Sequence, residues 1–121
     1  MFEKDLNVGF LLDFYGDVLT ERRRDALDFY YNNDMSLSEI AEGLSISRQG
    51  ARHIIKKGEE ELMLLESKLG LAARFTAIRA AADELGALAG QLADCEEPKE
   101  AKQLAARIGR LADAIAEKNR E

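Results

Sequence analysis

The chain is poor in several residue types on which common folds and functions depend. Among its 121 residues there are one proline, no tryptophan and a single cysteine, Cys95. A single cysteine cannot form a disulfide within the chain, and no secretory signal precedes the fold, so we expect a reducing, cytoplasmic setting. No apolar run approaches the roughly 18 residues that a bilayer-spanning helix needs. We therefore expect no membrane segment.

Residues that carry catalysis or hold a metal ion are also scarce. His53 is the only histidine and lies far in sequence from Cys95, whereas a metal site needs several convergent ligands. We interpret His53 as a neutral surface residue, with a contact to phosphate as the alternative. No nucleophile, metal cluster or phosphate-binding glycine loop accompanies the carboxylate pairs, such as Asp13 and Asp17. The sequence therefore predicts no catalytic residues, no metal and no cofactor.

Long stretches rich in alanine, leucine, glutamate, lysine and arginine make up most of the chain. They lack the β-branched alternation of strands, and their composition favours helices. The sequence therefore predicts an all-α protein. A first helix is expected from Leu6 to about Tyr15, with Asp5 as its N-cap. A second helix is expected to begin after Thr20 and to stop at the polar turn cluster of residues 32–34.

Two closely spaced helix starts follow in the middle of the chain. Ser36 and Glu39 form a capping box that opens a short helix, which breaks around Gly43. Ser47 opens the next helix, which could run unbroken to Leu69. Small and aliphatic side chains stand where two crossing helices would share a core, which is typical of a helix-turn-helix. These residues are Ile40, Ala41, Leu44, Ile46, Ala51 and Ile54.

The helix after Ser47 carries the residues that fit DNA. Arg48, Gln49 and Arg52 lie outside its apolar set, and arginine can pair with guanine and glutamine with adenine in the major groove. We therefore expect these three to read bases, since the first turns of a recognition helix reach base edges. The residues expected to hold phosphates are Arg22, Ser47, Lys56 and Lys57, of which Arg22 belongs to a second basic cluster at residues 22–24.

Several features weigh against this interpretation. The net charge is −6, whereas phosphate neutralisation supplies much of the affinity of DNA-binding domains. Gly50 weakens the recognition helix, and Ser45 occupies a turn position where glycine is usual. The alternative is a helical bundle in which Ser36 and Ser47 are ordinary caps and the basic residues form a solvated face.

The composition of the chain changes after Gly70, a residue suited to the end of a helix. An alanine-rich heptad segment follows, a break spans residues 94–98, and a last heptad helix completes the chain. This pattern predicts a helical hairpin or a coiled-coil element, and we expect a homodimer with a DNA-binding domain at 1–70 and a dimerisation tail at 71–121. The predicted stripe is Phe75, Ile78, Ala82, Leu85, Ala89 and Leu92, continued by Leu104, Ile108, Leu111 and Ile115.

Separated blocks of residues 3–70 resemble known proteins. Leu19-Thr20-Glu21-Arg22 and Ser36-Leu37-Ser38-Glu39-Ile40-Ala41 resemble region four of bacterial sigma factors, which binds promoter DNA. Together with Leu12-Asp13-Phe14-Tyr15, Tyr30-Tyr31 and Ile46-Ser47-Arg48-Gln49, they are similar to the YlxM family of small helix-turn-helix proteins. Where many relatives have alanine-valine, this chain has Gly50-Ala51. The resemblance implies a DNA-binding fold and a regulatory link to the signal recognition particle.

Two functions from different classes are therefore compatible with the sequence. One is a sequence-specific DNA-binding regulator. The other is a protein or RNA adaptor of the protein-targeting machinery, in which the helix-turn-helix is only a scaffold. The net charge and the acidic run Glu59–Glu61 favour the adaptor, because an acidic surface would meet a basic partner.

Overall fold

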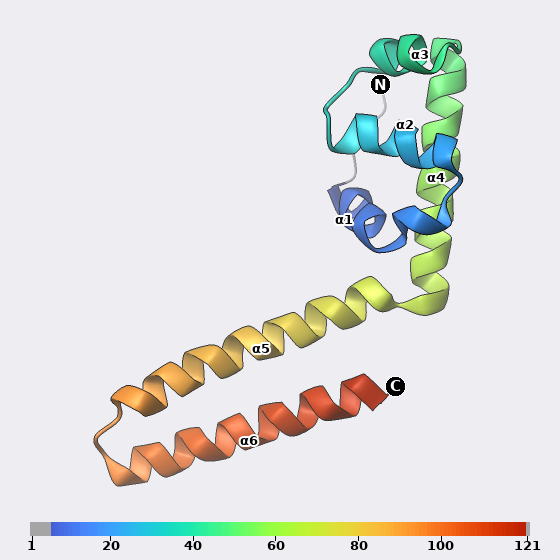
Figure 1. Ribbon diagram of the computed structural model, residues 1–121. Coiled ribbons are helices and arrows are strands. Elements are labelled where there is room, and N and C mark those ends of the chain that lie inside the picture. The colour runs from blue at the N-terminus through green and yellow to red at the C-terminus, as the bar shows by residue number, and fades with distance from the viewer. Residues whose placement is uncertain (1–5, 121) are drawn as a thin grey trace. The chain divides into compact units, whose positions relative to one another are not determined.

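The computed structural model describes residues 6–120, with the side chains of residues 7–118. Its elements are α1 (Leu6–Tyr15), the 3-10 turn η1 (Gly16–Val18), α2 (Glu21–Tyr31), α3 (Leu37–Leu44), α4 (Arg48–Leu69), α5 (Leu71–Asp94) and α6 (Pro98–Arg120) (Figure 1). Every described element is helical, which confirms the all-α prediction. The chain divides into two compact units, Met1–Ala72 and Ala73–Glu121.

Side-chain caps set the helix starts in the first unit. Thr20 Oγ1 accepts a hydrogen bond from the Arg23 N–H, and Ser36 and Glu39 complete the expected capping box. Gly70 ends α4 in the left-handed conformation, with φ 62°. These local predictions are confirmed. The expected cap of α1, Asp5, lies outside the described residues.

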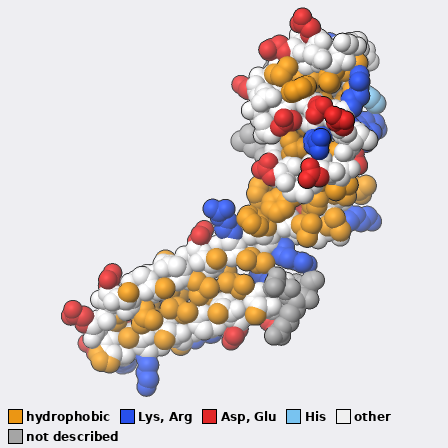
Figure 2. Space-filling model, in the orientation of Figure 1, with side chains coloured by type: hydrophobic (Ala, Val, Ile, Leu, Met, Phe, Trp, Pro, Cys, Tyr) orange, Lys and Arg blue, Asp and Glu red, His pale blue; other side chains and the backbone are white. Residues whose placement is uncertain are grey.

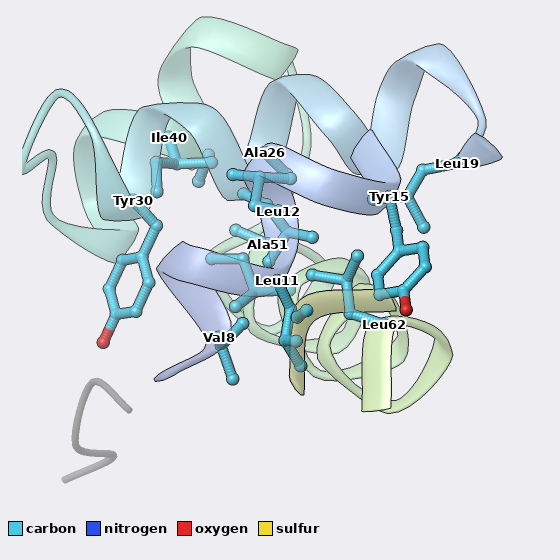
Figure 3. Packing of buried hydrophobic residues seen from close by; sticks show 14 residues of the cluster. Val8, Leu11, Leu12, Tyr15, Leu19, Ala26, Tyr30, Ile40, Ala51 and Leu62 are labelled. Atoms are coloured by element: carbon cyan, nitrogen blue, oxygen red, sulfur yellow. The ribbon is translucent and has the colours of Figure 1, made fainter. Parts of the chain in front are cut away.

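Helix α4 is the element on which the first unit is built. Helices α1, α2 and α3 all pack against it. Its buried residues recur every three or four positions, and α1 contributes Tyr15 and Val8 to the same core. Figure 3 shows Ala51 and Leu62 of α4 in one cluster with Val8 and Tyr15 of α1. The buried residues of α4 are Ala51, Ile55, Gly58 and Leu62.

At Gly58, α4 packs closely against Leu27 of α2. A Cβ atom built there would lie 2.7 Å from Cδ1 and 3.1 Å from Cγ of Leu27. Leu27 is itself fully buried, so it has little room to move aside. A glycine in the middle of a helix normally weakens the helix. At position 58 the close approach of α2 explains why glycine is present.

Tyr15 and Glu66 bind the first two residues of α5, Leu71 and Ala72, which belong to the first unit. The Tyr15 hydroxyl donates to Glu66 Oε1 at 2.6 Å and accepts from the Leu71 N–H at 3.0 Å. The same Glu66 oxygen accepts from the Ala72 N–H at 3.0 Å. Two backbone N–H groups at the beginning of α5, which lack partners within their own helix, are satisfied by side chains of α1 and α4.

The second unit is a hairpin of α5 and α6. Within the hairpin, the predicted stripe is buried or half-buried at Ile78, Leu85 and Leu92 and along α6, but three of its members are exposed. Ala82 and Ala89 are exposed, and Ala81 and Leu88 face inward instead, with Leu88 only 2% exposed. Both choices satisfy heptad spacing, and the observed one buries a leucine in place of an alanine, which removes more apolar area from water. Phe75 is also largely exposed, at 43%.

None of the described helices is long and apolar enough to cross a membrane.

Substituting Gly58 with alanine tests the close contact with Leu27. We expect Gly58→Ala to lower the free energy of unfolding by about 1–3 kcal/mol, because the added methyl overpacks a filled site. Gly43→Ala is the matched control, since a methyl group added there would meet no neighbouring atom within 4 Å and alanine is the better helix former. Urea unfolding followed by circular dichroism measures both. Equal effects of the two substitutions would contradict the close-contact explanation.

Tyr15→Phe tests the hydrogen bonds at the start of α5. Burial, then the hydrogen bond to Glu66, raises the pKa of Tyr15 above its usual value of 10.0. The folded state therefore favours the neutral phenol, and this stabilisation is present below about pH 10 and lost as pH rises through the folded pKa. We expect Tyr15→Phe to cost about 1–2 kcal/mol near neutral pH, with the difference from wild type shrinking in alkali. A difference that stays constant above about pH 10 would contradict this.

Candidate nucleic-acid interface

A tight turn sets the angle between α3 and α4. Ser45 takes the left-handed conformation (φ 57°, ψ 46°), and the Ile46 N–H donates to the Ala41 carbonyl at 2.9 Å. Ser47 Oγ then accepts from the Gly50 N–H at 2.9 Å and starts α4. The left-handed residue occupies the turn position where glycine is usual, as the sequence indicated. The result is a helix-turn-helix, with α3 lying across the first turns of α4 (Figure 1).

An open groove lies between the N-terminal parts of α3 and α4. Lysine and arginine side chains in this region lie beside the only histidine, which is pale blue in Figure 2. The wall from α4 carries three cations, and the wall from α3 carries two serines. The described residues that line the groove are Tyr30, Ser36, Leu37, Ser38, Arg48, Gln49, Arg52, His53 and Lys56.

The charge of this groove differs from that of the chain. Arg48, Arg52 and Lys56 line it at four-residue spacing, and no carboxylate is among the described residues lining it. Side chains four apart lie on one face of a helix, so these cations form a single stripe about 12 Å long at 1.5 Å per residue. An acidic chain therefore presents a locally cationic, exposed surface.

The structure brings together most of the predicted site residues. Arg48, Gln49 and Arg52, the expected base readers, are exposed and line the groove together with Lys56. Ser47 stands at the start of the same helix, where its hydroxyl caps the backbone. Lys57 is not among the lining residues, and its ammonium group lies 3.5 Å from the Glu60 carboxylate.

Arg22 lies away from this groove. Its neighbour Arg23 donates to Glu61 Oε1 at 2.8 Å, which places the start of α2 beside the middle of α4. Glu61 follows Arg48 by about 20 Å along the helix axis, at 1.5 Å per residue. Arg24 pairs with Asp17 at 3.4 Å. The second basic cluster is thus partly neutralised by acids of the same unit, and none of its residues is among the described residues that line the groove.

Sequence reasoning missed two contributors to the groove. Ser38 was not singled out, although it stands in the first turn of α3, where backbone N–H groups are free to meet an anion. His53 was interpreted mainly as a neutral surface residue, yet it lines the groove one turn after Gln49. The four-residue spacing from Gln49 to His53 was the available signal.

The acidic run at residues 59–61, which follows the groove-lining part of α4, is largely occupied within the unit. Glu59 accepts from the Tyr31 hydroxyl at 2.6 Å, and Glu61 accepts from Arg23. Glu60 lies beside Lys57. Glu59 and Glu61 thus hold α2 against α4, whereas Glu60 pairs within α4, so the run does not form an unpaired acidic surface.

Fold and groove together define a helix-turn-helix protein. A family model described as "Putative helix-turn-helix protein, YlxM / p13 like" matches residues 2–103. The chain belongs to this family, UPF0122, which confirms the resemblance to YlxM. The match extends beyond the residues 3–70 on which that resemblance stood and takes in α5 and the start of α6.

Individual relatives agree with this assignment. A UPF0122 protein of Acetivibrio thermocellus is 52% identical over 73 residues, which are 60% of this chain and 62% of the relative. One of Clostridium kluyveri is 49% identical over 69 residues, 57% of this chain and 62% of the relative. One of Listeria innocua is 43% identical over 75 residues, 62% and 68% respectively. The matched region thus spans less than two thirds of the first two relatives.

Ser45→Gly tests the strain in the turn. Serine in the left-handed region costs about 1–2 kcal/mol, which glycine avoids, while glycine loses more entropy on folding. We expect Ser45→Gly to raise the free energy of unfolding by about 0.5–1 kcal/mol. Ser45→Ala keeps the Cβ atom and should give no increase. Thermal unfolding of both variants measures this, and a destabilised glycine variant would contradict a strained turn.

Proposed function

We propose that the protein is a DNA-binding regulatory protein whose helix α4 enters the major groove at its N-terminal end. The observation that carries this proposal is the groove between α3 and α4, where three cations, a glutamine and a histidine lie exposed without a carboxylate among the described lining residues. B-DNA admits an α-helix in its major groove and offers distinct hydrogen-bond patterns there.

Roles follow from the chemistry of each side chain. Arg48 and Arg52 can pair with the N7 and O6 acceptors of guanine, and Gln49 with adenine. Lys56 stands two turns further along α4, where a point charge suits a backbone phosphate better than a base edge. Ser47 and the first turn of α3 add hydroxyl and N–H donors for the flanking phosphates.

A homodimer belongs to the same proposal. The exposed first turns of one copy of α4 would cover a single half-site and give limited affinity. Two copies would place their recognition helices about 34 Å apart, or a multiple of that, to meet successive turns of the major groove. With few phosphate contacts and a net charge of −6, binding should be modest and sensitive to salt.

The adaptor hypothesis is the second candidate, and its support is weaker. That hypothesis relies on the acidic residues 59–61, and each of them has a partner within the first unit. A link to signal recognition particle components stays a prediction from the resemblance. The relatives extend beyond the matched region, so activity and partners of the whole protein belong to this proposal as well.

Arg52→Ala tests base reading by α4. The probe is a fluorescein-labelled duplex selected by the full chain from a random-sequence DNA library. We expect Arg52→Ala to weaken binding to that duplex by roughly 1–3 kcal/mol and to reduce discrimination against a scrambled duplex. Lys57→Ala removes a charge from the same helix outside the groove, so it is the matched control and should have a small effect.

Salt titration and a competing RNA separate the two candidate functions. For DNA binding we expect the logarithm of the association constant to fall steeply with the logarithm of salt concentration. Failure to select any duplex, combined with saturable binding to signal recognition particle RNA or its protein GTPase, would overturn the DNA-binding proposal. Equal losses for Arg52→Ala and Lys57→Ala would remove Arg52 from the base readers.

A further inference from the structure

The hairpin of α5 and α6 leaves much of its own apolar seam uncovered. Of the large aliphatic side chains along it, Leu88 and Leu104 are buried, at 2% and 6% exposure. The others are only half-buried, because two helices bury only the side chains along their line of contact. These half-buried residues are Ile78, Leu85, Leu92, Ile108, Leu111 and Ile115.

The two flanks of the seam differ in polarity. Glu84, one position before Leu85, lies 3.8 Å from Arg107, one position before Ile108, so this flank carries an ion pair between the helices. The opposite flank, four positions after Ile78 and Ile108, carries Ala82 and Ala112. Ala89 and Ala105 continue it one heptad away. The hairpin therefore has one polar flat face and one apolar flat face.

We propose that a second copy of this hairpin packs on the apolar flat face, which is defined here by Ala82, Ala89, Ala105 and Ala112 together with the half-buried aliphatics. The two copies would form an antiparallel four-helix bundle. This inference rests on the homodimer of the proposed function and supplies its surface.

The size of the face fits a stable dimer. A helix of 24 residues, the length of α5, is about 36 Å long, and two helices side by side are about 20 Å wide. The footprint is then roughly 700 Å² on each copy, or roughly 1,400 Å² in total, which lies within the range of specific interfaces. Alanine on the flank allows the helices of the two copies to approach closely.

Charge favours a second copy over a strongly charged partner. Glu84 and Arg107 lie on the polar flank, where they pair with each other. The residues that define the apolar flat face include no charged side chain, so this face suits an identical apolar face better than a strongly charged partner. Figure 2 shows a band of apolar side chains along the hairpin, with charged side chains mainly at its margins.

Paired glutamate substitutions test the surface in the full chain without DNA. Ala82→Glu with Ala89→Glu places two carboxylates on the apolar face. Ala80→Glu with Ala87→Glu is the matched control, since these residues have the same spacing and are equally exposed on the other side of α5. Sedimentation equilibrium measures the mass, and circular dichroism verifies that both variants remain helical.

We expect the wild type and the control to have twice the chain mass of 13.5 kDa at micromolar concentration. The dimer of the Ala82→Glu/Ala89→Glu variant should have a dissociation constant at least about 100-fold higher than that of the wild type. The reason is that its new carboxylates would be buried in the interface without partners. A monomeric wild type, or an 82/89 variant that dimerises like the control, would overturn the inference. DNA binding by a monomeric wild type would leave the α4 interface standing, so the two failures are distinguishable.

Discussion

The packing of α2 against α4 at Gly58 and Leu27 is the contact on which the first unit depends. It allows two helices to share a core that α1 and α3 complete from either side. Because α4 continues for 22 residues, its exposed first turns belong to the same rigid rod as its buried middle. Arg48, Gln49 and Arg52 are therefore held by packing several turns away, and at the far end of α4 Glu66 and Tyr15 bind the N–H groups of Leu71 and Ala72.

Along α4, positively charged side chains lie near the N-terminus and acidic ones follow. The first turns of α4 bear cations that face an open groove, and the acids begin only after Lys57. Those acids are engaged by Tyr31, Arg23 and Lys57, so they stabilise the fold at short range. Salt screens exposed charges beyond about 10 Å at 0.1 M, so the local cationic stripe matters more to a docked phosphate than the net charge of −6.

Local signals in the sequence predicted most of the fold. Capping patterns at Thr20, Ser36 and Ser47 define helix starts through contacts within three residues, and Gly70 defines an end in the same way. The exposed stripe of Arg48 and Arg52 followed from helical spacing alone.

What the sequence could not supply were contacts between distant positions and choices between equivalent patterns. The pairs Arg23–Glu61 and Tyr15–Glu66 join residues 38 and 51 positions apart, and no local rule selects them. In α5 the alanines made two stripes equally compatible with heptad spacing, and only packing against α6 distinguishes Leu88 from Ala89. Ser38 joined the groove because the turn at Ser45 brings α3 against α4, which is again a tertiary effect.

The central claim is that the N-terminal half of α4 is the surface that meets DNA. Amide chemical shifts of the isotope-labelled full chain, recorded during titration with a selected DNA duplex, test it most directly. We expect perturbations concentrated at residues 36–38 and 48–56, with the amides of residues 59–61 and of the hairpin changing little. Saturable perturbations confined to other parts of the chain would contradict it.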